Sequence, residues 1–166
     1  MKLLLFIVVL ALAPASNPDR MLLYAARKLY FEFDIRKEAA QELYDKIYQS
    51  GNKDAVLQAY QGVAIAATAS NSMNPMSKWK RFSEGKMLIE QAINHEPENA
   101  EIRLMRLGVQ IAAPGFLAYS DDIDQDATII VEILEKNAEV FNDERFTRNV
   151  IVFLQEKLPA AHPLQE

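Results

Sequence analysis

Apolar residues recur every three or four positions along most of this chain, the period of an α-helix with one buried face. The clearest stripe consists of Phe82, Leu88, Ile89, Ala92 and Ile93. No segment shows the sustained apolar–polar alternation that is typical of a half-buried strand. The pattern therefore predicts an all-α protein. The expected helices cover about 19–33, 35–49, 53–69, 78–95, 100–112, 122–136 and 143–158.

Short loops containing glycine or proline separate several of these segments. Ser50-Gly51-Asn52 ends the second helix, Glu96-Pro97-Glu98-Asn99 forms a corner, and Ala113-Pro114-Gly115 stops the fifth helix. Asn74-Pro75 is expected to lie in a loop before the fourth helix. Because short loops make consecutive helices antiparallel, we expect six or seven helices stacked as hairpins, in a short superhelix or an irregular bundle.

One stretch, from Gly85 to Gly108, resembles the junction between two tetratricopeptide repeats. Gly85, Ile89, Ala92 and Pro97 stand at the offsets of that pattern, although Leu107-Gly108 falls one residue late. No second copy follows at the repeat's period of about 34 residues. The resemblance covers about a third of the domain and implies a helical hairpin of the tetratricopeptide type.

A longer resemblance runs over Asn74–Ile93 and Pro97–Asp124. These segments are similar to a family of small exported helical bacterial proteins to which no activity is assigned. The resemblance extends over nearly the whole domain, but it supplies no functional residues.

The first fifteen residues have the pattern of a secretory signal peptide. Lys2 is followed by an apolar run over Leu3–Ala13 and by an Ala13-x-Ala15 cleavage pattern. The run is shorter than the ~20 residues that a membrane-spanning helix needs. We therefore expect a signal peptide at 1–15, a single helical domain at 16–158 and a flexible tail at 159–166. The protein would be exported, either periplasmic or secreted, unless the uncleaved segment remained as an anchor.

Composition narrows the function classes. The chain has no cysteine, which excludes disulfides and thiolate metal sites. Its formal charge of −5 argues against nucleic acid as a partner, because phosphate binding requires an excess of Lys and Arg. No segment after the signal peptide is apolar enough to predict a transmembrane helix.

The strongest candidate site is a basic and aromatic cluster at the start of the fourth helix. It contains the only tryptophan, Trp79, and antiparallel packing would bring arginines of the fifth helix beside it. The alternative is a solvated helix start, with Trp79 and Phe82 in the core and the cations paired with glutamates such as Glu84, Glu98 and Glu101. The cluster is Lys78, Trp79, Lys80, Arg81, Phe82 and Lys86, and the partner-binding prediction comprises Lys78, Trp79, Lys80, Arg81, Arg103 and Arg106.

Other motifs predict no chemistry. Asp122-x-Asp124-x-Asp126 has the spacing that opens a calcium loop, but Ala127 and Ile133 replace the glycine and glutamate that the loop requires. We interpret Asp121, Asp122 and Asp124 as helix-cap and first-turn acids that complement the helix dipole. The two histidines, His95 and His162, show no spacing that favours a metal site. Among the six tyrosines, Tyr60 and Tyr119 are the two candidates for a binding face.

No nucleophile elbow or other catalytic motif is present, so no catalytic residue, cofactor or metal is predicted. The leading hypothesis is an exported scaffold or adaptor that binds a protein or peptide across a helical face. Two alternatives stay open: a carrier of a small molecule or lipid between the helices, and an enzyme whose site is not visible in the sequence.

Overall fold

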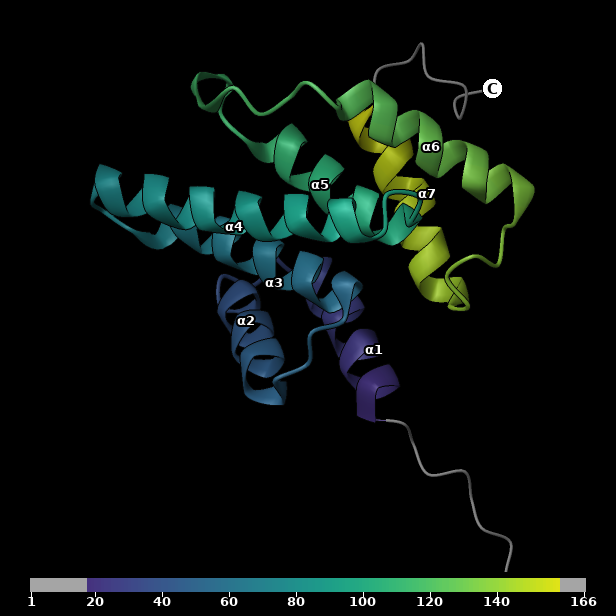
Figure 1. The fold of residues 1–166 in the computed structure, drawn as a ribbon, viewed down its shortest axis with the longest axis horizontal. Helices are drawn as coiled ribbons and strands as arrows, with labels where there is room; N and C mark the ends of the chain where they lie inside the picture. The colour runs from purple at the N-terminus through teal and green to yellow at the C-terminus, as the bar shows by residue number, and fades with distance from the viewer. Residues whose placement is uncertain (1–17, 159–166) are drawn as a thin grey trace, which may run out of the picture.

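The structure is a computed structural model that describes residues 18–158. In this range the chain forms seven α-helices and no strand, which confirms the all-α prediction (Figure 1). Consecutive helices pack against one another as hairpins. The predicted signal peptide, the predicted tail and His162 lie outside the described residues. The helices are α1 (Pro18–Tyr30), α2 (Ala39–Ser50), α3 (Ala55–Thr68), α4 (Pro75–His95), α5 (Ala100–Ala112), α6 (Ile123–Lys136) and α7 (Glu144–Lys157), with single 3₁₀ turns η1 (Ala69–Asn71) and η2 (Gly115–Leu117).

Helix α4 begins three residues earlier than the sequence predicts. The side chain of Asn74 accepts a hydrogen bond of 2.9 Å from the Met76 amide, and Pro75 occupies the first helical position. Asparagine before proline is a favourable helix start, since the cap satisfies a free amide and proline has none to satisfy. The prediction of a loop over Ser70–Pro75 was therefore wrong at Pro75, which is helical, whereas Asn74 precedes the helix as its cap.

The connection between α1 and α2 is longer than predicted. Helix α1 ends at Tyr30, and residues 31–35 form turns, beginning with a 3.0 Å bond from the Glu32 amide to the Leu29 carbonyl. The rings of Phe31 and Phe33 both meet Tyr30 edge to face. A continuous helix would point these two phenylalanines about 200° apart, so the turn allows both to contact the same tyrosine.

Helices α3 and α4 approach each other closely through two glycines, Gly62 and Gly85. A Cβ atom built on Gly85 would collide with the Gly62 carbonyl oxygen, and one built on Gly62 would lie 2.7 Å from the Gly85 carbonyl oxygen. The absence of side chains thus lets the two backbones touch.

Helix α5 lies in the middle of the fold and packs against α3, α4 and α6 (Figure 1). Its apolar residues Ile102, Met105 and Leu107 are fully buried, and charged residues of the same helix are buried with them. Helix α7 closes the other side of the core, where the Phe146 ring packs edge to face on Phe31 and Phe141. None of the helices described is long and apolar enough to cross a bilayer.

Candidate functional site

A groove lies between α2, the end of α3 and the start of α4. It is open to solvent and has a volume of about 350 Å³. A neighbouring hollow of about 290 Å³ shares part of its lining and extends it toward η1 through Asn71 and Ser72. We call this feature the α2–α4 groove. Its lining residues are Gln41, Tyr44, Ile65, Thr68, Ser77, Lys80, Arg81 and Glu84.

The α3–α4 connection builds one wall of the α2–α4 groove. Thr68 ends α3, and its hydroxyl donates a 2.7 Å bond to the Ile65 carbonyl of the preceding turn. The chain then reverses through η1 and restarts at the Asn74 cap. This reversal brings Arg81 of α4 against α3, where its guanidinium donates a 3.1 Å hydrogen bond to the Thr68 hydroxyl.

The groove presents positive charge in an acidic protein. Within the described part of the chain, neither Lys80 nor Arg81 has a carboxylate oxygen within 4.0 Å. Glu84 also lines the groove but forms no ion pair with either cation. One N–H of the Arg81 guanidinium donates to the Thr68 hydroxyl. A guanidinium has five N–H donors, so the others are not used by this bond. Arg81 can therefore bind a carboxylate from outside the domain.

One tyrosine of α2 lines the groove and stacks on a second, exposed tyrosine of the same helix. Tyr44 lines it, and its ring stacks on Tyr48 with centroids 5.7 Å apart and planes inclined by 16°. Tyr48 is 67 % exposed. The amide of Gln41 and the hydroxyls of Thr68 and Ser77 add hydrogen-bonding groups, and no histidine or cysteine lines the groove. This set offers hydrogen bonds, charge and ring contact to a ligand.

The predicted basic and aromatic cluster is divided between several places. Lys80 and Arg81 line the groove, and Phe82 is buried, as the solvated-helix alternative expected. Trp79, however, is 60 % exposed, so its assignment to the core in that alternative is wrong. Lys78 is exposed next to it.

Arg103 and Arg106 do not join the exposed cluster. Both are buried on α5, where they bind the fully buried carboxylate of Asp126 on α6. Arg103 donates a 2.7 Å bond to Oδ1, while Arg106 donates bonds of 2.7 and 2.8 Å to the two oxygens. Glu90 and Asp122 lie 3.2 and 3.4 Å from the Arg106 guanidinium. Asp126 and its neighbours hold these two arginines inside the domain, so they are buried rather than exposed beside Lys78 and Trp79.

This network raises the pKa of Arg106. Burial alone would lower it, but the hydrogen bonds and charge of Asp126, together with Glu90 and Asp122, more than compensate. The guanidinium therefore stays charged, and the network links α4, α5 and α6. Asp122 and Asp126 of the rejected calcium loop thus contact the buried arginines, and no cluster of candidate metal ligands occurs among residues 18–158.

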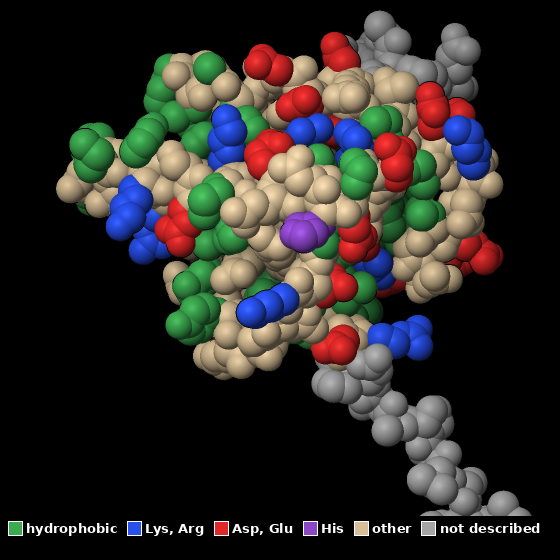
Figure 2. All heavy atoms as spheres, in the orientation of Figure 1, with side chains coloured by type: hydrophobic (Ala, Val, Ile, Leu, Met, Phe, Trp, Pro, Cys, Tyr) green, Lys and Arg blue, Asp and Glu red, His purple; other side chains and the backbone are tan. Residues whose placement is uncertain are grey.

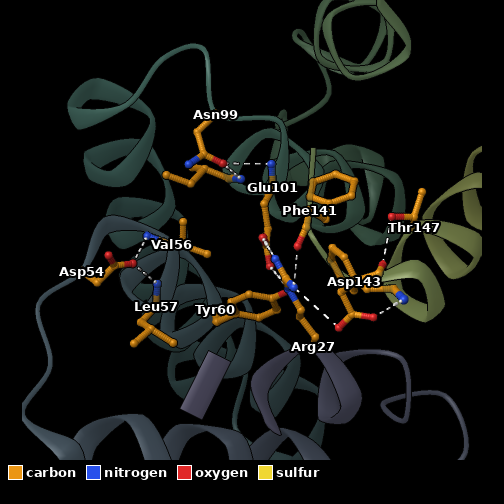
Figure 3. Close-up of polar contacts among 12 residues, drawn as sticks. Arg27, Asp54, Val56, Leu57, Tyr60, Asn99, Glu101, Phe141, Asp143 and Thr147 are labelled. Atoms are coloured by element: carbon orange, nitrogen blue, oxygen red, sulfur yellow. Dashed lines mark hydrogen bonds and ion pairs between the residues drawn. The ribbon is translucent and has the colours of Figure 1, made fainter. Parts of the chain in front are cut away.

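A second buried network joins α1, α3, α5 and the start of α7 (Figure 3). Arg27 forms two hydrogen bonds with the Glu101 carboxylate, 2.9 and 2.6 Å long, and a third of 3.0 Å with the Phe141 carbonyl. The Tyr60 hydroxyl donates to the same carboxylate at 2.8 Å. Asp143, which caps α7 by accepting from the Phe146 amide, lies 3.6 Å from the guanidinium. The expected pairing of Glu101 with the basic cluster is therefore wrong, since Arg27 occupies it.

Both tyrosines selected from the sequence are buried in these networks. Tyr60 is bound to Glu101, and the Tyr119 hydroxyl donates a 2.6 Å bond to Glu90. Burial, reinforced by the adjacent carboxylates, raises the pKa of both phenols well above the ordinary value of 10.0. They are structural residues, so neither lines a binding face. His95 lies exposed in the last turn of α4.

Comparison with known proteins returns no matching family model, no matching curated relative and no matching solved structure. The function is therefore inferred from the geometry of the domain.

Proposed function

We propose that this protein is an exported helical adaptor that binds an extended peptide segment of a partner protein in the α2–α4 groove. The supporting observation is the Arg81 guanidinium, which is fixed by the Thr68 hydroxyl inside a groove and has no carboxylate partner there. Binding a carboxylate would complete its hydrogen bonds, as Asp126 does for Arg103 and Arg106 in the interior.

The remaining lining supports a peptide as the ligand. Gln41 and Ser77 offer groups that hydrogen-bond a peptide backbone, while Tyr44 offers a rigid ring for a side chain. Helical hairpins of the tetratricopeptide type commonly bind extended peptides along such faces. The tetratricopeptide resemblance of α4 and α5 adds to this argument, because Gly85, Ile89 and Ala92 of that pattern are buried at the contact of the hairpins.

The test is selection of peptides from a phage-displayed random library against the immobilised full chain. We expect enriched peptides to contain an acidic residue or a free C-terminal carboxylate. Their affinity should fall about tenfold or more in Arg81→Gln, the loss expected for a hydrogen bond between charged groups. Arg148→Gln, an exposed change on α7, is the matched control and should leave affinity unchanged. Peptides that bind Arg81→Gln and Tyr44→Ala as tightly as the wild-type chain would contradict the proposed site.

A further inference from the structure

Four large apolar side chains project into solvent near the start of α4 and in the α5–α6 connection. Met73, Met76, Trp79 and Phe116 are 97, 70, 60 and 85 % exposed. We call these four residues the apolar tip. Phe116 lies in η2, whereas the other three lie just before α4 or in its first turns. Isolated exposed apolar residues are common, but a group of this size at one place requires an explanation.

The two segments of the apolar tip belong to the same end of the molecule. Tyr119, three residues after Phe116, packs its ring edge to face on Phe82 at 5.8 Å and under the Lys86 ammonium at 4.4 Å. Trp79 lies about one helical turn before Phe82 and two turns before Lys86, on nearly the same side of α4. Figure 1 shows the start of α4 and the α5–α6 connection at one end of the fold, and Figure 2 shows hydrophobic and basic side chains gathered there.

This end is also where the chain is positive. Residues 70–83 contain Lys78, Lys80 and Arg81 and no acidic residue, while residues 112–120 contain no charged residue. Removing these three cations from the formal charge of −5 leaves −8 on all other residues. The rest of the molecule would thus be repelled by a negatively charged surface, and this end would be attracted to it.

We infer that the apolar tip docks on the surface of an anionic phospholipid bilayer. Projecting Trp, Phe and Met side chains flanked by lysines match the bilayer interface, where rings enter the acyl boundary and ammonium groups remain among the phosphates. Each Lys or Arg near such a surface contributes about 1 kcal/mol of attraction. The charge separation favours lipid over a protein partner, because a bilayer presents negative charge over the whole width of this end. The four apolar residues are not part of the lining of the α2–α4 groove, whereas Lys80 and Arg81 line the groove and also supply positive charge at this end.

Trp79 provides a direct test, since it is the only tryptophan of the chain. The full chain is mixed with vesicles of equal parts phosphatidylcholine and phosphatidylglycerol, or with phosphatidylcholine alone. We expect the Trp79 emission to shift to shorter wavelength with the anionic vesicles only, and to be quenched by lipids brominated on their acyl chains. Lys78→Glu with Lys80→Glu should weaken partitioning about tenfold or more.

Two further variants separate the tip from other parts of the chain. Phe116→Ser retains the fluorophore and should also weaken partitioning, although it lies 37 residues away in sequence. Lys53→Glu with Lys136→Glu makes the same charge change on exposed positions outside the tip and should have little effect. Unchanged Trp79 emission would overturn the inference, even if vesicles captured the chain through another segment. Equal shifts with neutral and anionic vesicles would overturn it as well.

Discussion

The guanidinium of Arg27 and the carboxylate of Glu101 form a two-pronged pair across 74 residues of sequence, with hydrogen bonds of 2.9 and 2.6 Å. The pair joins the first helix to the central one, and the guanidinium also lies 4.6 Å from the centre of the Phe146 ring. Both side chains are nearly buried, at 11 and 7 % exposure. Loss of either partner leaves the other charge inside the domain, which is costly.

We therefore predict that Arg27→Met lowers the free energy of unfolding by about 3–5 kcal/mol. Arg36→Met breaks surface ion pairs with Glu32 and Glu42 and should cost less than about 1 kcal/mol. The double variant Arg27→Met, Glu101→Leu should be more stable than the sum of its single changes predicts. Urea denaturation followed by circular dichroism measures all five proteins, namely the wild type, the single variants Arg27→Met, Glu101→Leu and Arg36→Met, and the double variant. Equal losses for Arg27→Met and Arg36→Met would refute the role given to the buried pair.

The second network predicts a similar penalty at Asp126. Asp126→Asn removes the negative charge between Arg103 and Arg106 but keeps the size of the side chain. We expect a loss of about 3–5 kcal/mol in the free energy of unfolding. Asp124→Asn changes an exposed acid of the same helix and should stay within about 0.5 kcal/mol of wild type. If chemical denaturation gave Asp126→Asn and Asp124→Asn the same free energy of unfolding, that result would contradict the network.

The glycine contact between α3 and α4 should not tolerate a methyl group. Gly85→Ala would place a Cβ against the Gly62 carbonyl oxygen, and backbone atoms cannot move aside as a flexible side chain can. We expect a loss of about 1–3 kcal/mol, typical of overpacked cores. Gly115→Ala is the control, because nothing lies within 4 Å of a Cβ built there. A thermal melt that shows Gly85→Ala as stable as Gly115→Ala would disprove the close approach.

High pH should destabilise the fold through its buried tyrosines. Burial raises the pKa of Tyr60 and Tyr119 above the ordinary value of 10.0, so the folded protein retains protons that the unfolded chain releases. Their contribution to stability is fully present below pH 10 and declines as the pH rises beyond it, because the unfolded state then binds fewer protons. Burial raises the pKa of Tyr30 in the same way. Phenolate absorbance should therefore show three phenols that ionise only as circular dichroism reports unfolding. Ionisation of all six tyrosines in the folded state would contradict this.

Hydrophobic period and loop chemistry predicted the fold class and nearly every helix, because each helix buries one regular stripe. Helix ends were less accurate where tertiary contacts decide them, as in the turn that brings Phe31 and Phe33 to Tyr30. The burial of Arg103 and Arg106 left no signal in the sequence. The two arginines and Gln110 fall on one side of α5 at i, i+3 and i+7 spacing, which is the pattern of a solvent-facing stripe, and only the packing of α6 with Asp126 buries that side.

The groove could be predicted only in part. Lys80 and Arg81 were selected because a basic and aromatic cluster stands out in an acidic chain, and both line the groove. Gln41, Tyr44 and Thr68 were missed, since ordinary polar residues on helices carry no local signal for a site. Their convergence depends on the reversal between α3 and α4 and on the packing of α2 against α3.

The most direct test of the proposed function is photo-crosslinking from inside the α2–α4 groove. A photoreactive phenylalanine analogue replaces Tyr44 in the full chain, and the same residue replaces Tyr24, exposed on α1, as control. Irradiation with a selected acidic peptide should crosslink the peptide at position 44, and Arg81→Gln should abolish the crosslink. Equal crosslinking at positions 24 and 44 would contradict a peptide site in the groove. Crosslinking at position 44 that is unchanged in the Arg81→Gln variant would contradict it as well.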